Sequence, residues 1–178
     1  MNVLEKLFLI LSDHWEDEIE IKRNDFLVSP GQSNTNLYFV KEGSLRVFIE
    51  DEIEEHTIRF GYKDSLITAL DTFLTDKPTS FYIQAIKKSK LKVISKEKYF
   101  SLMNSKIEYK EVWDKLLQSF VYQQMEREVD LITYSPQKRF ERVFKRSPQL
   151  FQEIPQKYIA SYLRMTPETL SRILKTLD

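Results

Sequence analysis

Residues 36–50, NLYFVKEGSLRVFIE, form two alternating runs of apolar and polar residues on either side of Glu42-Gly43. Alternation of this kind is typical of half-buried β-strands. A Glu-Gly pair suits the positive φ angles of a tight turn. The stretch therefore predicts an antiparallel hairpin.

Short segments rich in β-branched and aromatic residues continue on both sides of this hairpin. They are EIEIK (18–22), DFLV (25–28), EHTIRF (55–60), FYIQAIKKS (81–89) and KLKVIS (90–95). Turn-forming pairs such as Pro30-Gly31 and Lys77-Pro78 separate them. Short strands at this spacing predict a small antiparallel sandwich or barrel. The apolar spacing within residues 2–12 predicts an amphipathic helix packed on it.

Residues 106–133 contain neither glycine nor proline and predict one long helix. Its apolar stripe is longer than a small domain needs, so one face is expected to cover the strands and another to meet a second subunit. The residues expected at that dimer interface are Trp113, Leu116, Leu117 and Phe120. The alternative is a helix that packs only on its own core.

The C-terminal residues 154–178, IPQKYIASYLRMTPETLSRILKTLD, contain two short helical patterns separated by a turn. In a helix-turn-helix, the residues where the helices cross must be small or apolar. The matching residues here are Ile159, Ala160, Leu163, Met165, Leu170 and Ile173. Thr166 is the expected N-cap of the second helix, with Pro167 in its first turn. Arg164 stands at the turn position that requires a positive φ angle, at a cost of about 1 kcal/mol.

A helix is also expected to start at Ser135-Pro136, and residues 147–155 are expected to form a connector. The charge is uneven. The chain has 27 basic and 27 acidic residues, but residues 136–178 hold nine basic and four acidic ones, an excess of five positive charges. A basic helix-turn-helix indicates binding to double-stranded DNA. The alternatives are an ordinary helical hairpin and a solvated basic surface.

The polar face of the second helix is the expected DNA-binding surface. Glu168 is placed to accept a hydrogen bond from cytosine, and Arg172, four residues later, to donate two to guanine. Lys175, Lys138 and Arg139 are expected at phosphates. The complete predicted DNA-binding set is Thr166, Glu168, Thr169, Ser171, Arg172, Lys175, Lys138 and Arg139.

The chain resembles the Crp/Fnr transcription regulators along nearly its whole length. GQSNTNLYFVKEGSLRVF (31–48) is similar to the opening of their cyclic-nucleotide-binding β-roll, the long helix to their dimerisation helix, and TPETLSRILKTL (166–177) to their recognition helix. The resemblance implies an α+β fold. An antiparallel β-roll effector domain (1–108) would be followed by a dimerisation helix (109–134) and a helix-turn-helix DNA-binding domain (135–178). It also implies a homodimer on a palindromic operator, with RNA polymerase as a further candidate partner.

The nucleotide-binding motif of that family is missing. Its members hold the ribose with a glutamate and the cyclic phosphate with an arginine, whereas the matching positions here are Ala69 and Thr79. An unpaired buried phosphate is costly, so cyclic AMP is not expected to bind. The pocket either takes a different ligand or is a structural remnant. The polar or lining residues expected there are Ala69, Leu70, Thr79, Ser80, Gln123 and Gln124.

Composition limits the other classes of function. The chain has no cysteine, which excludes disulfides and thiolate metal sites. Its two histidines, His14 and His56, form no ligand cluster, so no metal or other cofactor is expected, and a cupin-like enzyme would need more histidine. The apolar run LFLIL (7–11) is too short for a signal peptide, which indicates a cytoplasmic protein without a membrane partner. A ligand-binding or protein-interaction module with a vestigial helix-turn-helix is the remaining alternative.

Overall fold

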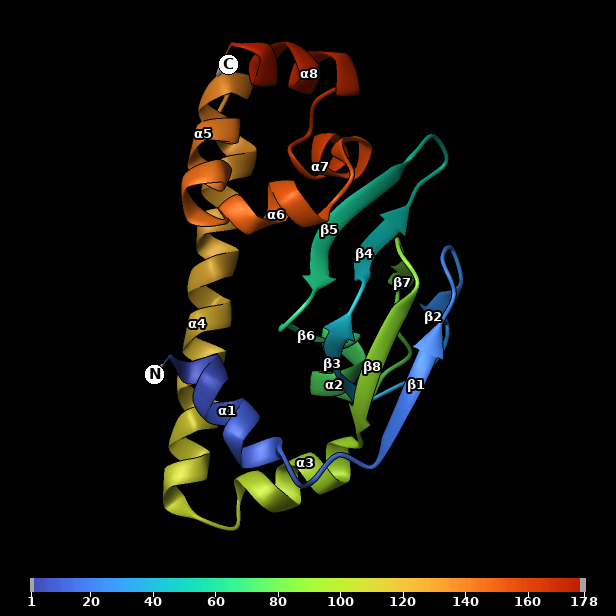
Figure 1. Ribbon diagram of the computed structural model, residues 1–178, viewed down its shortest axis with the longest axis vertical. Helices are drawn as coiled ribbons and strands as arrows, with labels where there is room; N and C mark the ends of the chain where they lie inside the picture. The colour runs from blue at the N-terminus through green and yellow to red at the C-terminus, as the bar shows by residue number, and fades with distance from the viewer. Residues whose placement is uncertain (1, 177–178) are drawn as a thin grey trace.

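The computed structural model describes residues 2–176, in which a β-roll stands beside one long helix and a cluster of short helices lies at one end (Figure 1). The strands are β1 (Asp17–Ile21), β2 (Phe26–Val28), β3 (Leu37–Glu42), β4 (Ser44–Glu50), β5 (Glu55–Tyr62), β6 (Leu66–Ile67), β7 (Tyr82–Ala85) and β8 (Ser89–Ile94). The helices are α1 (Val3–Leu11), α2 (Leu70–Thr75), α3 (Lys96–Met103), α4 (Ile107–Ile132), α5 (Pro136–Arg146), α6 (Pro148–Glu153), α7 (Gln156–Tyr162) and α8 (Pro167–Lys175). The predicted α+β class with an antiparallel β-roll is confirmed.

Two four-stranded antiparallel sheets make the roll. Their orders are β1-β8-β3-β6 and β2-β7-β4-β5. Alternating residues of both sheets, among them Val40, Leu45, Ile83 and Leu91, meet in one buried core. β5 lies at the edge of its sheet, on the side of the C-terminal helices (Figure 1).

The turn at Gly43 is not a hairpin, so that prediction was wrong. β3 and β4 belong to different sheets and do not pair. Gly43 has a φ of +89°, and a Cβ there would lie 2.2 Å from Ser89 Oγ and 2.4 Å from the carbonyl oxygen of Lys88. Glycine is therefore required because the chain turns a corner between the sheets while the start of β8 passes against it.

Replacing Gly43 by alanine is expected to lower the free energy of unfolding by about 2 to 3 kcal/mol, since strain at positive φ adds to a steric clash. Gly31→Ala is the matched control. Gly31 also has a positive φ, of +85°, but an added Cβ would meet nothing within 4 Å. It should cost only about 1 kcal/mol. Urea unfolding of both variants measures the difference in their free energies of unfolding. Equal losses would show that the close approach of Lys88 and Ser89 does not require glycine at position 43.

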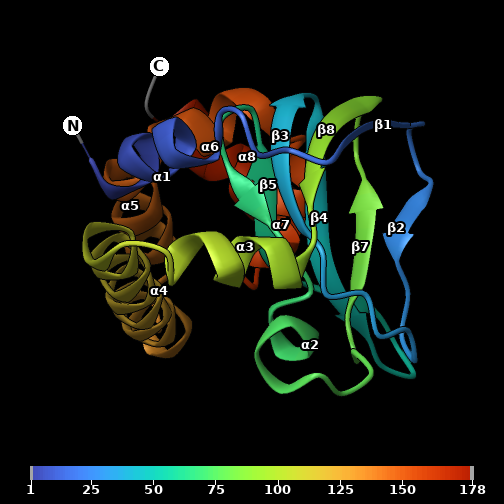
Figure 2. The same ribbon diagram turned by 90° about the horizontal axis from the view of Figure 1, so that it is seen from below.

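Helix α4 is joined to the roll by α1 and α3. In Figure 2, α3 crosses from the strands to the start of α4, and Figure 1 shows α1 lying against α4. The buried side chains of this junction include Leu7, Phe73, Tyr99, Met103 and Leu116. Half-buried Trp113 packs edge-on against Phe73, Tyr99 and Phe100. The N-terminal half of α4 is therefore part of the core of its own chain.

The connector expected at 147–155 instead contains the short helix α6, which begins at Pro148. Helices α5, α6, α7 and α8 build a second core that includes Phe140, Val143, Leu150 and Ile159. The roll contributes buried Ile86 to this core, and Phe60 and Tyr62 of β5 pack against it. The last two residues of the predicted 135–178 domain lie outside the described residues. Within residues 2–176, no helix has the length and apolar character needed to cross a membrane.

Candidate nucleic-acid interface and candidate ligand pocket

Helices α7 and α8 are joined by a Schellman turn. Arg164 has a φ of 53° in the left-handed region, as the sequence predicted. The amide of Met165 donates to the carbonyl oxygen of Ala160 at 3.1 Å, and the amide of Arg164 donates to that of Ser161 at 3.1 Å. These two bonds satisfy the last carbonyl groups of α7 and fix the direction in which the chain leaves it.

The packing of the pair matches the positions that the sequence singled out. Five of the residues are buried in one cluster, and Met165 packs against it half-buried; the five are Ile159, Ala160, Leu163, Leu170 and Ile173. Ala160 is fully buried. Thr166 caps α8, because its hydroxyl accepts from the amide of Thr169 at 3.2 Å. The local geometry of the pair was therefore predictable.

The outer face of α8 is polar and open to solvent. Glu168, Arg172 and Lys175 are exposed, whereas Thr169 and Ser171 are half-buried. Among the described residues, neither Arg172 nor Lys175 forms an ion pair. The pKa of Glu168 is lowered, first by a hydrogen bond from its own backbone amide, then by the Thr166 hydroxyl and by the positive charge of Arg172. The face offers one carboxylate and two cations to a ligand.

The two residues expected at phosphates from α5 differ. Lys138 is exposed in the first turn of α5. Arg139, in contrast, donates from Nη1 to the carbonyl oxygen of Thr133 at 2.8 Å and from Nη2 to that of Arg164 at 3.0 Å. Its guanidinium joins the end of α4 to the turn between α7 and α8. Two donors of Arg139 are therefore already used within the chain, and its contact with a phosphate stays a prediction.

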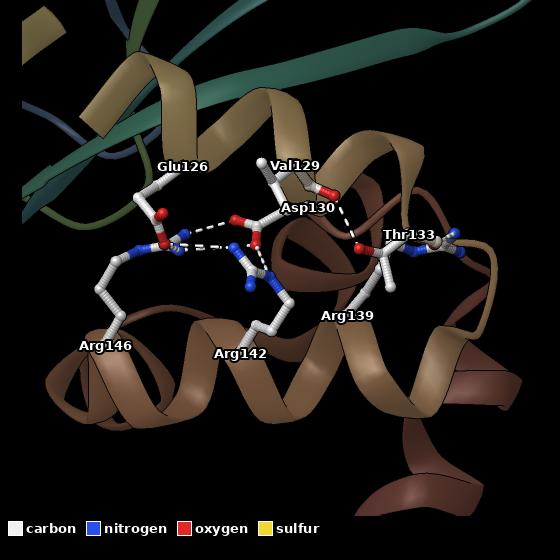
Figure 3. A network of polar contacts seen from close by, with 7 residues as sticks. All are labelled: Glu126, Val129, Asp130, Thr133, Arg139, Arg142 and Arg146. Atoms are coloured by element: carbon white, nitrogen blue, oxygen red, sulfur yellow. Dashed lines mark hydrogen bonds and ion pairs between the residues drawn. The ribbon is translucent and has the colours of Figure 1, made fainter. Parts of the chain in front are cut away.

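A network of ion pairs fixes α5 against α4 (Figure 3). Asp130 of α4 is completely buried and accepts from Arg142 Nε at 2.9 Å and from Arg146. Glu126, one turn earlier, accepts from Arg142 Nη2 at 3.1 Å and Arg146 Nη1 at 3.3 Å. Two carboxylates of one helix thus hold two guanidinium groups of the next. The direction of α5, and with it the position of α8, is tied to the end of α4.

Helix α7 lies on the outer edge of β5. The amide of Thr57 donates to Ser161 Oγ at 3.1 Å, and Ser161 Oγ donates to the carbonyl oxygen of Glu55 at 3.2 Å. Arg164 donates to Nδ1 of His56, whose Nε2 donates to Asp51 at 2.5 Å. The β-roll therefore contacts the helical pair directly.

Arg127 of α4 adds a second contact between the two parts of the chain. It is buried, lies over the Tyr162 ring at 3.7 Å and donates to the Tyr162 carbonyl oxygen. Sequence reasoning missed Arg127 because nothing in the sequence signals that this arginine is buried.

A cavity of about 300 Å³ lies between the roll and α4. It is lined mostly by apolar side chains, and its charged lining residues are Arg59 and Asp71. Of the six residues expected there, Leu70 and Gln124 line it. Gln123 lines the neighbouring cleft, and Ala69 is buried in the core of the roll.

The remaining two expected residues, Thr79 and Ser80, bind an internal carboxylate. Asp71 accepts from the Thr79 hydroxyl at 2.9 Å, from the Ser80 amide at 3.1 Å and from the Thr72 amide at 2.8 Å. Donors of this kind would suit a phosphate, but here Asp71 already occupies them. A bound phosphate would meet this negative charge, which is a further reason against a cyclic nucleotide.

Three of the four residues expected at a dimer interface face the core of their own chain. Leu116 is 2% exposed and belongs to the core. Trp113 and Phe120 pack against the same core, and Leu117 is half-buried. The prediction is corrected for Leu116, which has no surface left for a partner. Trp113 and Phe120 line the cavity.

An exposed apolar stripe lies instead on the opposite side of α4, in its C-terminal half. Tyr122, Met125, Val129 and Ile132 follow each other at spacings of three, four and three residues and are 62%, 59%, 39% and 81% exposed. Val121, 61% exposed, widens the stripe. This spacing is that of the a and d positions of a coiled coil.

Known proteins match in sequence pattern and in fold. The family model "Cyclic nucleotide-binding domain" matches residues 18–106. A CooA variant from Carboxydothermus hydrogenoformans is similar with a TM-score of 0.74 and 16% identity, covering 96% of this chain and 82% of that one. FixK2 from Bradyrhizobium japonicum is similar with a TM-score of 0.73 and 14% identity, covering 90% of this chain and 83% of that one. The Thermus thermophilus Catabolite Activator Protein is similar with a TM-score of 0.59 and 20% identity, covering 99% of this chain and 86% of that one. No curated protein sequence matches significantly.

Proposed function

Because the chain belongs to the cyclic nucleotide-binding domain family, we propose that it is a dimeric, DNA-binding transcription regulator of Crp/Fnr type, acting in the cytoplasm. Its fold is that of solved Crp/Fnr regulators. One observation carries the proposal. The outer face of α8 presents Arg172 and Lys175 without ion-pair partners among the described residues, on a capped helix at the end of the molecule (Figure 1).

The pair α7 and α8 acts as a helix-turn-helix in this proposal. The Schellman turn and the buried Ala160 hold α8 at a fixed angle to α7. Residues on the first turns of a recognition helix contact base edges. Glu168 and Arg172 lie one turn apart on the exposed face, so both reach one major groove, whereas Lys175 and Lys138 contact phosphates.

Dimerisation through the exposed stripe of α4 supports the same function. A two-fold axis along this stripe would place one α8 from each subunit on the same side of the dimer. Two recognition helices about one turn of DNA apart are what a palindromic operator requires. In each subunit, the ion pairs of Asp130 fix α5 against α4 and so help to set the position of α7 and α8 relative to α4.

Arg172→Ala is expected to cost about 1 to 3 kcal/mol in affinity for the preferred operator and to relax selectivity at one base pair per half-site. Lys175→Ala should weaken binding to all sequences alike and lower the salt slope by about one unit. Operators selected from random DNA, then titrated with matched and mismatched sites over a salt series, measure both effects. Unchanged affinity and selectivity in Arg172→Ala would remove base reading from α8. No salt-dependent binding by the wild type would favour a module with a vestigial helix-turn-helix.

A further inference from the structure

Arg59 of β5 places a half-buried cation in the wall of the cavity between the roll and α4. No described residue brings a carboxylate within ion-pair distance of its guanidinium. The nearest aromatic contact is the Phe120 ring, whose centroid is 5.4 Å from Cζ. Burial lowers the pKa of Arg59 because water solvates the charge poorly. An anion from outside the chain would satisfy it.

The rest of the cavity favours an apolar body. Its walls include Phe73, Phe81 and Trp113, and apolar residues outnumber polar ones. Its volume of about 300 Å³ is at the small end of the range for pockets that hold organic ligands. A ligand that fills it is therefore a compact molecule with a large apolar surface.

The position of Asp71 decides where an acidic group can sit. Its carboxylate already accepts from Thr72, Thr79 and Ser80, so that part of the cavity repels a second anion. The acidic group must then lie near Arg59. One arginine balances one negative charge, whereas a dianionic phosphate would leave a second charge unpaired in apolar surroundings.

We propose that this cavity binds an amphipathic organic monocarboxylate, with an aryl or short alkyl body between Phe73 and Trp113 and the carboxylate on Arg59. The role of this acid as an effector of DNA binding rests on the proposed function. Binding of the acid itself is independent of DNA.

The structure also provides a path from this ligand to the DNA-binding helices. Arg59 and Phe120 line both the cavity and the neighbouring cleft, which is lined on its other side by Arg127 and Tyr162. Thr57, two residues before Arg59 on β5, donates to Ser161 of α7. The pairing of β4 with β5 is irregular between these two residues. Phe48 pairs with Thr57 and its neighbour Val47 pairs with Arg59, so one residue of β5 is left without a partner in β4. A ligand that pulls on Arg59 therefore acts on the strand that holds α7.

The test uses calorimetric titration of the full chain with hexanoate, octanoate, phenylacetate and 4-phenylbutanoate. Each acid has its neutral amide as a matched control, and 3′,5′-cyclic AMP is the comparison nucleotide. Because a hydrogen-bonded charge pair is involved, at least one acid should bind roughly 10- to 100-fold more tightly than its amide. Arg59→Met should remove this preference while the amide affinity stays unchanged. Arg59→Lys should retain part of it.

Equal affinity of every acid and its amide for the wild type would overturn the proposal, and so would the absence of saturable heat with all four acids at millimolar concentration. Tight binding of cyclic AMP would overturn it as well. The comparison of acid and amide needs only the wild type, so it stands even if Arg59→Met does not fold. Binding of an acid without any change in operator affinity supports the ligand class and removes its role as effector. Acid binding by a chain that does not bind DNA contradicts the proposed function alone.

Discussion

Replacing Asp130 by alanine is expected to lower the free energy of unfolding by about 3 kcal/mol, at the lower end of the range for breaking a buried ion pair. Asp130 is completely buried and accepts from both Arg142 and Arg146. Without it, two guanidinium groups remain at the interface of α4 and α5 with Glu126 as their shared acceptor. The loss stays below the upper limit because both arginines are partly exposed and water reaches them.

Two controls separate charge from shape. Asp130→Asn keeps the size of the side chain but removes its charge, so most of the loss should persist. Glu126→Gln removes a carboxylate that is 29% exposed and should cost about 1 kcal/mol or less. Urea unfolding measures the global effect. Hydrogen exchange in α5 should rise more than in the β-roll, because the network fixes α5 in particular. If Asp130→Ala and Glu126→Gln lower the free energy of unfolding by the same amount, burial of Asp130 adds nothing to the strength of its ion pairs.

Introducing glutamate at both Met125 and Ile132 is expected to produce a folded monomer that binds the operator about 1,000-fold more weakly, at the level of non-specific binding. Both side chains are largely exposed, at 59% and 81%, so the substitutions leave the core of the chain intact. Like charges would face each other across a two-fold interface and prevent association. A single helix-turn-helix then contacts only one half-site.

Sedimentation velocity measures the oligomeric state of the double variant, and titration measures its affinity for the operator. Far-ultraviolet circular dichroism checks that the helices remain. The control is glutamate at Gln123, which is exposed on the same helix but lies on the side of the cleft toward the roll, away from the apolar stripe. It should leave both the dimer and the DNA affinity unchanged. If the double variant remains dimeric, the stripe is not the dimer interface. If the wild type is a monomer that binds the operator tightly, DNA binding does not require a dimer.

Local patterns predicted the elements whose geometry depends on neighbours in sequence. The cap at Thr166 and the positive φ at Arg164 follow from rules about a single turn, and both are confirmed. The corner at Gly43 was misread because membership of one sheet or the other depends on β8, which lies far away in sequence. Glycine was the right signal, but its reason is the approach of Lys88 and Ser89.

The sequence also did not decide which side of the long helix faces its own core. Trp113, Leu116 and Phe120 form its most apolar part, and the roll and α3 use it because burial of large aromatic surfaces contributes most to stability. The stripe of Tyr122, Met125, Val129 and Ile132 remains exposed. Similarly, Arg139 looks like a surface cation in the sequence, yet its guanidinium binds backbone carbonyl groups of two other segments. Only the tertiary arrangement distinguishes these uses.

The contact of Ser161 with β5 has a consequence for the solubility of the chain. β5 ends its sheet, so its outward amide and carbonyl groups are free to pair with a strand of another molecule. Ser161 occupies two of these groups, at Thr57 and Glu55, and α7 covers the strand around them. During synthesis the strand exists about a hundred residues before α7 is made, and for that interval the edge is open to association between nascent chains. We therefore expect α7 to protect the roll against edge-to-edge aggregation.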